Sequence, residues 1–296
     1  MPDRRDRMNI GFIGAGKVGC TLGKYFAEGG LEVKGYYSLP EETSLEAARF
    51  TNTLRFETAE DLIRECDLVF VTVPDSVIRE TWDTIKDHDI KDKIICHCSG
   101  AMTSYEAFPG IEQRGASGYS VHPLFAVSDR FSTYRELPGV FFTLEGSADR
   151  IEEVKALLEG LGNPVRIIEG SDKTMYHCAA AASSNLVCAI LDMSFELMTR
   201  CGFTEEDARR AMTSLIKGNV DHVLEVGAEK GLTGPIERND TATVSKHLEC
   251  LSGGDTLQMK ETYRLLSLRL ADIANRRHPD RDYTGMYQLL GERKEK

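Results

Sequence analysis

The stretch SDKTMYHCAAAASSN, residues 171–185, carries basic and polar side chains on a segment that is otherwise rich in alanine. Lys173 and His177 are four residues apart, and Ser184 and Asn185 follow two turns later. Residues four apart share one face of a helix. An amine and an imidazole on that face could stabilise a carbonyl oxygen and donate a proton to it. We therefore predict that Lys173 and His177 are catalytic and that Ser184 and Asn185 bind substrate.

Two further residues could serve the same chemistry. His122, in SVHPLF, follows a predicted strand and precedes Pro123, which fixes its backbone, so it is a third catalytic candidate. Arg238 lies in the loop GLTGPIERND, where a guanidinium could hold a substrate carboxylate bidentately. In the alternative interpretation neither residue is catalytic: Lys173 is a solvated residue of the first helical turn, and His177 is a core histidine whose hydrogen bonds are made within the protein.

A glycine-rich turn at the other end of the chain indicates a dinucleotide site. GFIGAGKVG supplies Gly14, Gly16 and Gly19 directly after a predicted strand and at the start of a predicted helix. In such turns the first glycine makes the tight bend, the second lets the backbone approach a pyrophosphate, and the third allows close helix packing. We predict that cofactor is bound by Gly14, Ala15, Gly16, Lys17, Val18 and Gly19.

The remaining cofactor residues follow from the ends of later strands. Ser38 stands at the tip of the second predicted strand, where an acidic residue would select NAD, so the uncharged serine favours NADP, although Leu39 replaces the usual arginine. The ends of two further predicted strands, VTVPDS and HCSGA, fall where the nicotinamide would lie. They contribute Val73, Pro74, Ser99 and Gly100, with Ser99 also a candidate substrate ligand.

These residues must be positioned by two kinds of structure. Alternating short β-rich runs and amphipathic segments predict βαβ units and a parallel, doubly wound Rossmann-type sheet over residues 8–169, an α/β class. The strands are expected at 8–14, 31–38, 67–74, 92–99, 118–125, 139–146 and 164–170. From residue 171 onward only helical periodicity is present, which predicts an all-α domain over 170–296.

Composition narrows the class of partner. The net charge of −11 argues against a nucleic-acid partner. No apolar run approaches the roughly 20 residues that a membrane span needs, and the start MPDRRDRMNI is charged where a signal peptide is hydrophobic, so we expect a cytoplasmic protein without a membrane partner. The eight cysteines lack the spacing of a zinc site, so no metal is expected.

The motifs together resemble a known family. GFIGAGKVG, VTVPDS, HCSGA, HPLF, YHCAAAASSN and TGPIERNDTATVSKHL are similar to those of a bacterial family of Rossmann-like proteins with a helical C-terminal domain of long-undefined function. That family is related to pyrroline-5-carboxylate reductase and the 6-phosphogluconate dehydrogenase superfamily. Some members resemble an alternative type of ketopantoate reductase. The resemblance implies a small carboxylate substrate, NADPH, and a homodimer formed through the helical domain.

Three activities follow as expectations. The first is NADPH-dependent reduction of a small 2-oxo or imino acid, above all 2-dehydropantoate, with pyrroline-5-carboxylate as a related substrate. Ketopantoate reductases carry an asparagine one turn after the lysine, whereas His177 follows Lys173 here, so the proton donor stays open among Lys173, His177 and His122. The second, from the similarity of HPLF to prephenate and arogenate dehydrogenases, is oxidation with His122 as base. The third is dinucleotide sensing without turnover.

Overall fold

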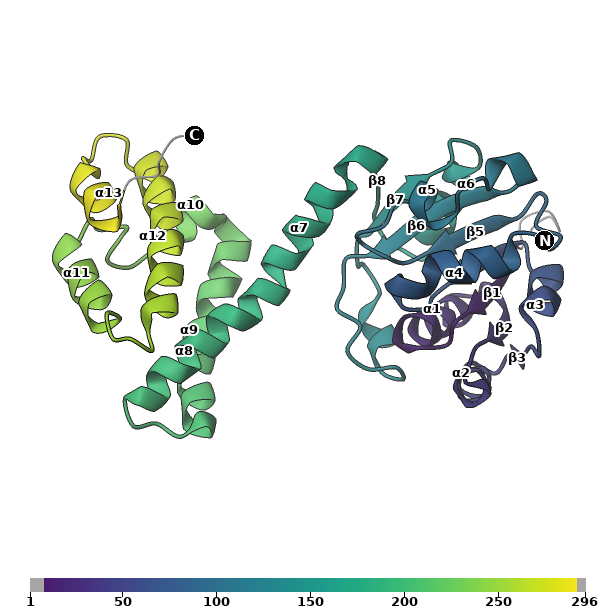
Figure 1. Cartoon of the computed structure of the whole chain (residues 1–296), viewed down its shortest axis with the longest axis horizontal. Helices are drawn as coiled ribbons and strands as arrows, with labels where there is room; N and C mark the ends of the chain where they lie inside the picture. Colours follow the sequence, from purple (N-terminus) through teal and green to yellow (C-terminus); the bar gives the residue numbers. More distant parts are fainter. Residues whose placement is uncertain (1–7, 292–296) are drawn as a thin grey trace. The chain divides into compact units, whose positions relative to one another are not determined.

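The computed structural model describes residues 8–291, and the chain divides into two compact units, unit 1 ending at Ser184 and unit 2 starting at Asn185 (Figure 1). In unit 1 the described chain builds a sheet with helices on both faces, and in unit 2 it builds helices only.

The sheet of unit 1 has eight strands in the order β3-β2-β1-β4-β5-β6-β7-β8. Its first six positions give the strand order of a dinucleotide-binding fold, in which β1 and β4 are neighbours although β2 and β3 intervene in the sequence. The strands are β1 Asn9–Ile13, β2 Glu32–Tyr37, β3 Leu54–Arg55, β4 Leu68–Val71, β5 Ile94–His97, β6 Ser117–Pro123, β7 Phe142–Gly146 and β8 Val165–Ile167.

Alternate strand residues supply two hydrophobic cores, one on each face of the sheet. Ile10 and Phe12 of β1 pack with helices α1 Lys17–Glu28, α2 Glu41–Thr51 and α6 Ile151–Gly160. Ile13 of the same strand packs on the opposite side with α3 Ala59–Glu65, α4 Asp75–Ile85 and α5 Ser104–Ala107. Alternate residues of each strand point to opposite faces, and both faces are buried, so the strands have nearly continuous apolar sequences.

The predicted fold class is confirmed, with one correction to the sheet. All seven predicted strands are present, and β3, which has only two residues, was missed. A fully parallel sheet was wrong, because β6 and β7 are antiparallel. The link between them, residues 124–141, is long enough for a parallel crossover but contains only the short 3-10 helix Thr133–Glu136, and a parallel crossover usually runs through an α-helix that packs on the sheet.

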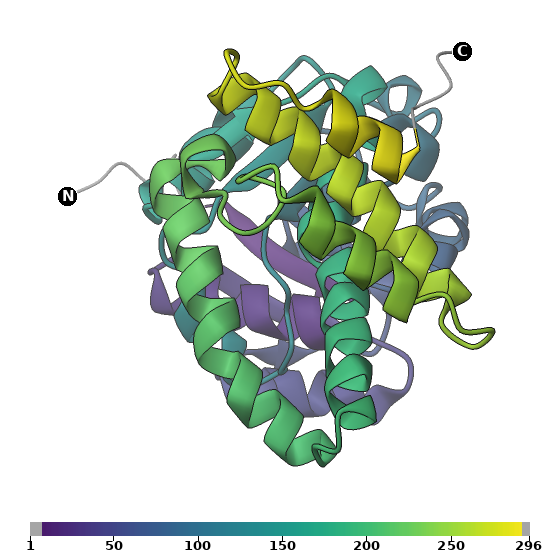
Figure 2. The ribbon, with the colours of Figure 1, turned by 90° about the vertical axis from the view of Figure 1, so that its left-hand side faces the viewer.

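The described part of unit 2 is entirely helical. Helices α8 and α9 form a hairpin joined by a turn at Gly202, and α10, α11, α12 and α13 follow (Figure 2). The bounds are α8 Asn185–Arg200, α9 Glu205–Val226, α10 Ala228–Gly231, α11 Thr241–Cys250, α12 Leu257–Arg277 and α13 Thr284–Leu290. A core led by Val244, Leu268 and Met286 holds the last helices together.

Residues 170–200 contain two features that the sequence patterns did not predict. The helical stretch expected from residue 171 onward is interrupted at Ser184, which has non-helical dihedrals, so α7 Lys173–Ser183 lies in unit 1 and the two compact units divide after Ser184. The stretch Gly170–Arg200 also passes a length and composition test for a membrane span, with a mean hydropathy of 1.4. None of its most apolar window is buried within residues 8–291, and a single helix of this kind does not identify a membrane protein.

Candidate functional site

The glycine turn after β1 has the geometry that a pyrophosphate needs. Gly14 has a positive φ of 99°, and a Cβ there would lie 2.7 Å from the backbone carbon of Thr72. At Gly19 a Cβ would lie 2.3 Å from the carbonyl oxygen of Gly14, so only glycine lets α1 approach the strand. A Cβ at Gly16 would meet nothing within 4 Å. The first and third glycines are thus required by packing, and the second faces open space.

The helix that follows this turn is oriented to receive an anion. Gly16 is the N-cap of α1, and no side chain caps the helix. The described first turn contains no acidic residue, so its backbone NH groups and partial positive charge face no local carboxylate. Among the other predicted cofactor residues here, Ala15 is buried, Lys17 is exposed and Val18 is partly buried. The residues present therefore fit a dinucleotide pyrophosphate.

Ser38 lies where the sequence predicted it, at the tip of β2. It follows Tyr37, whose carbonyl oxygen accepts a hydrogen bond from the Gly14 NH at 2.8 Å, so the tip of β2 is fixed beside the glycine turn. Helix α2 starts three residues later at Glu41. An adenosine ribose bound to a Rossmann-type sheet lies at this tip.

Two histidines meet at the carboxyl ends of β5 and β6. A Cβ on Gly100, just after β5, would lie 2.9 Å from Nε2 of His122 at the end of β6. It would also lie 2.9 Å from Cδ2 of His177 on α7. Gly100 is therefore the point at which both predicted imidazoles converge, and the missing side chain makes room for them.

A tyrosine that the sequence reading missed supports His122. The Tyr176 hydroxyl lies 2.6 Å from Nδ1 of His122, and the two rings pack edge to face. Burial, together with the neighbouring Lys173 and His177, lowers the pKa of His122 to about 4. His122 is consequently uncharged at neutral pH in the free protein. Tyr176 could have been suspected, since it stands three residues after Lys173 on the same helix.

Lys173 lies behind this histidine pair. Its side chain is only 1% exposed, and its amine donates a 2.6 Å hydrogen bond to the hydroxyl of Ser120. Ser120 and His122 are two residues apart on β6, so they point to the same face of the sheet. Burial lowers the pKa of the Lys173 amine, and the carboxylate of Glu145 opposes that shift most strongly. Lys173 thus contacts the chain's own groups in a closed interior, whereas His177 is exposed.

The hydroxyl of Ser99 is already engaged. It donates to Asp75 Oδ2 at 2.6 Å and accepts from the backbone NH groups of Ala101 and Met102. These bonds tie the end of β5 to the first residue of α4, beside Val73 and Pro74. Ser99 therefore shapes the turn around Gly100, and Asp75 was not anticipated, although it is part of the quoted VTVPDS motif.

Of the remaining predicted substrate ligands, only Ser184 lies on unit 1, and it does not belong to this cluster. Ser184 ends α7, roughly 10 Å along the helix axis from His177, and its hydroxyl donates to the carbonyl oxygen of Ala180. Asn185 and Arg238 belong to unit 2. The loop that carries Arg238 is held by its neighbours, because Glu237 bonds to His278 and Asp240 caps α11.

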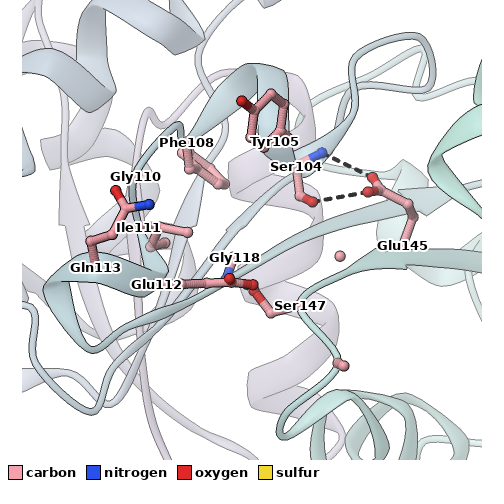
Figure 3. Close-up of a pocket in the computed structure, with 12 residues that line it drawn as sticks. Ser104, Tyr105, Phe108, Gly110, Ile111, Glu112, Gln113, Gly118, Glu145 and Ser147 are labelled. Carbon is pink, nitrogen blue, oxygen red and sulfur yellow. Dashed lines mark hydrogen bonds between the residues drawn. The ribbon is translucent and has the colours of Figure 1, made fainter.

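A separate cavity of about 240 Å³ lies on unit 1 between α5 and the end of β7 (Figure 3). None of the predicted site residues lines it. Its one buried charge, Glu145, accepts hydrogen bonds at 2.9 Å from the backbone NH and the hydroxyl of Ser104 (Figure 3). These bonds fix the start of α5 to β7. The cavity therefore marks a structural junction, which also supplies the carboxylate that opposes the pKa shift of Lys173.

Comparisons with known proteins agree with this arrangement. Residues 2–123 match the model of a Rossmann-like domain, and residues 140–270 match the model named Domain of unknown function (DUF2520). The chain joins a Rossmann-like domain to a DUF2520 domain. This confirms the resemblance drawn from the motifs, and the Rossmann-like domain fits the binding of a dinucleotide.

Solved structures share the fold over most of their length. A Bacteroides fragilis protein provisionally described as an NADP oxidoreductase is 23% identical, with a TM-score of 0.67 over 90% of this chain and 99% of that one. Pyrroline carboxylate reductase from Plasmodium falciparum, solved with NADP, is 15% identical, with a TM-score of 0.60 over 91% and 96%.

One curated relative also matches. Glycerol-3-phosphate dehydrogenase [NAD(P)+] from Chlorobium limicola is 26% identical over 172 residues. That alignment covers 50% of each chain, so the chain spans about half the length of the curated relative that it matches. These relatives are oxidoreductases that use NAD or NADP according to their names.

Proposed function

We propose that the chain is an NADPH-dependent reductase of a small 2-oxo or imino acid. The observation that carries this proposal is the convergence of His122 and His177 on Gly100, at the same carboxyl edge of the sheet as the glycine turn. Ligands of open α/β sheets bind at that edge. When bound, the reduced nicotinamide would supply a hydride, and a proton donor must be supplied by the chain.

His122 is the proton donor in this proposal. Its Nε2 faces Gly100, and its Nδ1 is held by the Tyr176 hydroxyl, so the ring has a fixed orientation. The free protein keeps this imidazole neutral, because burial and the neighbouring Lys173 and His177 lower its pKa. A bound carboxylate places a negative charge beside the ring and raises its pKa again. An acidic substrate would therefore create the imidazolium that protonates the product oxygen or nitrogen.

In this proposal Lys173 influences His122 from the buried side of the ring and does not contact the substrate. Its amine is buried against Ser120, two residues before His122 on the same strand face. Lys173 is thus a positioning residue, and His177, which is exposed beside Gly100, would contact the substrate alongside His122.

The proposed substrate is 2-dehydropantoate, with pyrroline-5-carboxylate as the related imino acid. Both carry a carboxylate, and Arg238 is proposed as its ligand. On unit 2 alone, the Glu237 and Asp240 side chains are bonded within the domain, whereas the Arg238 side chain is exposed and forms no hydrogen bond or ion pair within residues 8–291, although its charge acts on the nearby Asp240 carboxylate. A rigid loop that leaves one guanidinium unpaired suits the recognition of an anion.

The test is a substrate panel followed by absorbance of the reduced nicotinamide. Purified protein is mixed with NADPH and with 2-dehydropantoate, pyrroline-5-carboxylate or another 2-oxo acid. Oxidation of NADPH with one of these acids is the expected result. Tight NADPH binding without turnover on any acid would instead indicate a dinucleotide sensor.

A second activity is favoured by the neutral state of His122. A neutral imidazole can accept a proton, so the same residue suits oxidation of a prephenate-like hydroxy or cyclic acid with NADP. Reduction of NADP with prephenate or arogenate, together with no activity toward the 2-oxo acids, would select this activity. The same set of substrates therefore distinguishes a reductase from an enzyme that oxidises its substrate.

We also propose a cytoplasmic homodimer formed through unit 2. Among the described residues, α8 buries none and α9 buries only Ala208, although both carry exposed large apolar side chains such as Leu186 and Leu224. A second copy of the chain is the occupant proposed for these faces. Light scattering after size exclusion should give twice the mass of 32.9 kDa, and Leu224→Glu should lower it toward one chain.

A further inference from the structure

The dinucleotide site has a cation that the sequence reading did not find. Arg55 lies on β3, and its backbone pairs with Tyr36 of β2, two residues before Ser38. Its Nη1 forms an ion pair at 2.9 Å with Oε1 of Glu41, the residue that follows the Ser38–Pro40 turn and starts α2. The guanidinium therefore stands over the tip of β2, the place at which the adenosine ribose lies in this fold.

The bonding of Arg55 is incomplete. Its side chain is 24% exposed, and the buried Nε has no hydrogen-bond partner within residues 8–291. Its ion-pair partner Glu41 is 66% exposed, so that pair is screened by water and weak. A guanidinium has five NH donors, and a phosphate could accept from two of them at once. Arg55 is thus held in place by Glu41 while some of its NH donors remain available for a ligand.

Local charge makes an added cation necessary. Glu41 and Glu42 are the first two residues of α2, and they would repel a phosphate at the tip of β2. Ser38 can donate one hydrogen bond to such a phosphate but carries no charge to offset the two carboxylates. Arg49, also on α2, lies in the last turn, at the opposite end of the helix. Arg130 also bonds to α2, at Thr43 and Glu46 further along the helix, so Arg55 is the arginine that pairs with its first residue among residues 8–291.

We infer that Arg55 recognises the 2′-phosphate of NADPH and that Glu41 holds the guanidinium ready in the free protein. The inference rests on the proposed use of NADPH. On binding, the phosphate accepts hydrogen bonds from the guanidinium and from the Ser38 hydroxyl, and Glu41 turns toward solvent. The chain thus selects NADP with an arginine from β3, in place of one at Leu39 directly after the tip of β2.

The test measures binding rather than turnover. Affinities for NADPH, NADH and adenosine 2′,5′-bisphosphate are determined by calorimetry for wild type, Arg55→Met and Arg49→Met, a control that removes the same charge from α2. Arg55→Met should weaken NADPH and the bisphosphate by at least about tenfold and leave NADH unchanged, because one charge-assisted contact is lost. Glu41→Gln should strengthen NADPH, since it frees the guanidinium.

The outcomes separate this inference from the proposed function. If Arg55→Met leaves NADPH binding intact, or weakens NADPH and NADH equally, Arg55 is not the phosphate ligand, while the reductase proposal stands. Weaker binding of both dinucleotides by Glu41→Gln would show that Glu41 binds the ribose, and would also overturn the inference. No binding of either dinucleotide by wild type would remove both proposals. Thermal unfolding of Arg55→Met checks that β3 and the sheet remain folded.

Discussion

The two units each contain a histidine paired with a tyrosine in almost the same geometry. In unit 1 the Nδ1 of His122 lies 2.6 Å from the Tyr176 hydroxyl, and in unit 2 the Nδ1 of His247 lies 2.8 Å from the Tyr263 hydroxyl. Both pairs have ring centroids 5.7 Å apart and packed edge to face. A local motif of this kind therefore does not by itself identify a catalytic residue.

The surroundings of the two pairs differ. His122 ends a strand of a dinucleotide-binding sheet, faces Gly100, and lies near a buried lysine and a second histidine. His247 lies in the last turn of α11, and its tyrosine partner lies on α12. In unit 2 the pair joins two packed helices. The comparison indicates that function depends on the position of the ring at the edge of the sheet and on the charges around it. The His247–Tyr263 pair of unit 2 also provides a control for substitutions at His122 and Tyr176.

The largest difference between the pairs is expected in turnover. His122→Asn should lower turnover about 10²–10⁴-fold, because the group that transfers the proton is lost. His247→Asn, which removes the matching ring from unit 2, should leave turnover within about twofold. NADPH affinity of both variants, measured by nicotinamide fluorescence, should stay at the wild-type value. Equal losses of turnover would mean that His122 is structural like its counterpart.

The next effect is on stability. Burial lowers the pKa of His97 to about 3 and that of His122 to about 4, against about 6.5 in the unfolded chain. Below pH 6.5 the unfolded chain binds protons that the folded chain does not. The free energy of unfolding therefore decreases as the pH is lowered from about 6.5 to about 4. The loss for His97 alone should be about 2 kcal/mol between pH 7 and pH 5.

Urea unfolding followed by tryptophan fluorescence can measure this loss in unit 1 alone. Trp82 is the single tryptophan of the chain and is fully buried in unit 1. His97→Gln should flatten the dependence of the unfolding free energy on pH between 7 and 5. If the unfolding free energy of this variant depends on pH as strongly as that of the wild type, His97 is not the source of the pH dependence.

Removing the amine behind His122 should have a smaller effect on turnover. Lys173→Met keeps the length of the side chain and removes a positive charge that lowers the pKa of His122. The pKa of His122 should rise, and turnover should fall about tenfold, because the Ser120 hydroxyl loses its donor. NMR titration of the seven histidines can follow this, with His247 as the resonance that should not move. No change at His122 would argue that Lys173 only fills space.

Much of the fold was predictable because its determinants are local. Gly14, Gly16 and Gly19 follow a strand and start a helix, and the structure assigns each a distinct steric role. The break at Ser184 was missed, since the alanine-rich stretch on both sides favours an uninterrupted helix. The antiparallel β7 was missed because strand direction depends on the connection and not on the strand's own residues.

The candidate site was predictable in part. Its histidines are recognisable in the sequence as possible catalytic residues, whereas the residues that contact them in the folded chain are not. His122 and His177 were named from the sequence, and the structure brings them together at Gly100. Tyr176 and Arg55 were not named, since each gains its meaning from a contact with a distant segment. The burial of Lys173 was also not foreseen: a lysine in the first turn of a helix usually reaches solvent, and here it is covered by β6.

The smallest effect should distinguish the two tyrosines. Tyr176→Phe removes the hydroxyl that orients His122 and should lower turnover about threefold to tenfold, since one hydrogen bond contributes about 0.5–1.5 kcal/mol. Tyr263→Phe removes the matching hydroxyl from unit 2 and should cost about the same in stability while turnover stays constant. A double variant His122→Asn/Tyr176→Phe should be no slower than His122→Asn, because Tyr176 acts only through the ring it holds. Additive losses would instead assign Tyr176 a direct contact with the substrate.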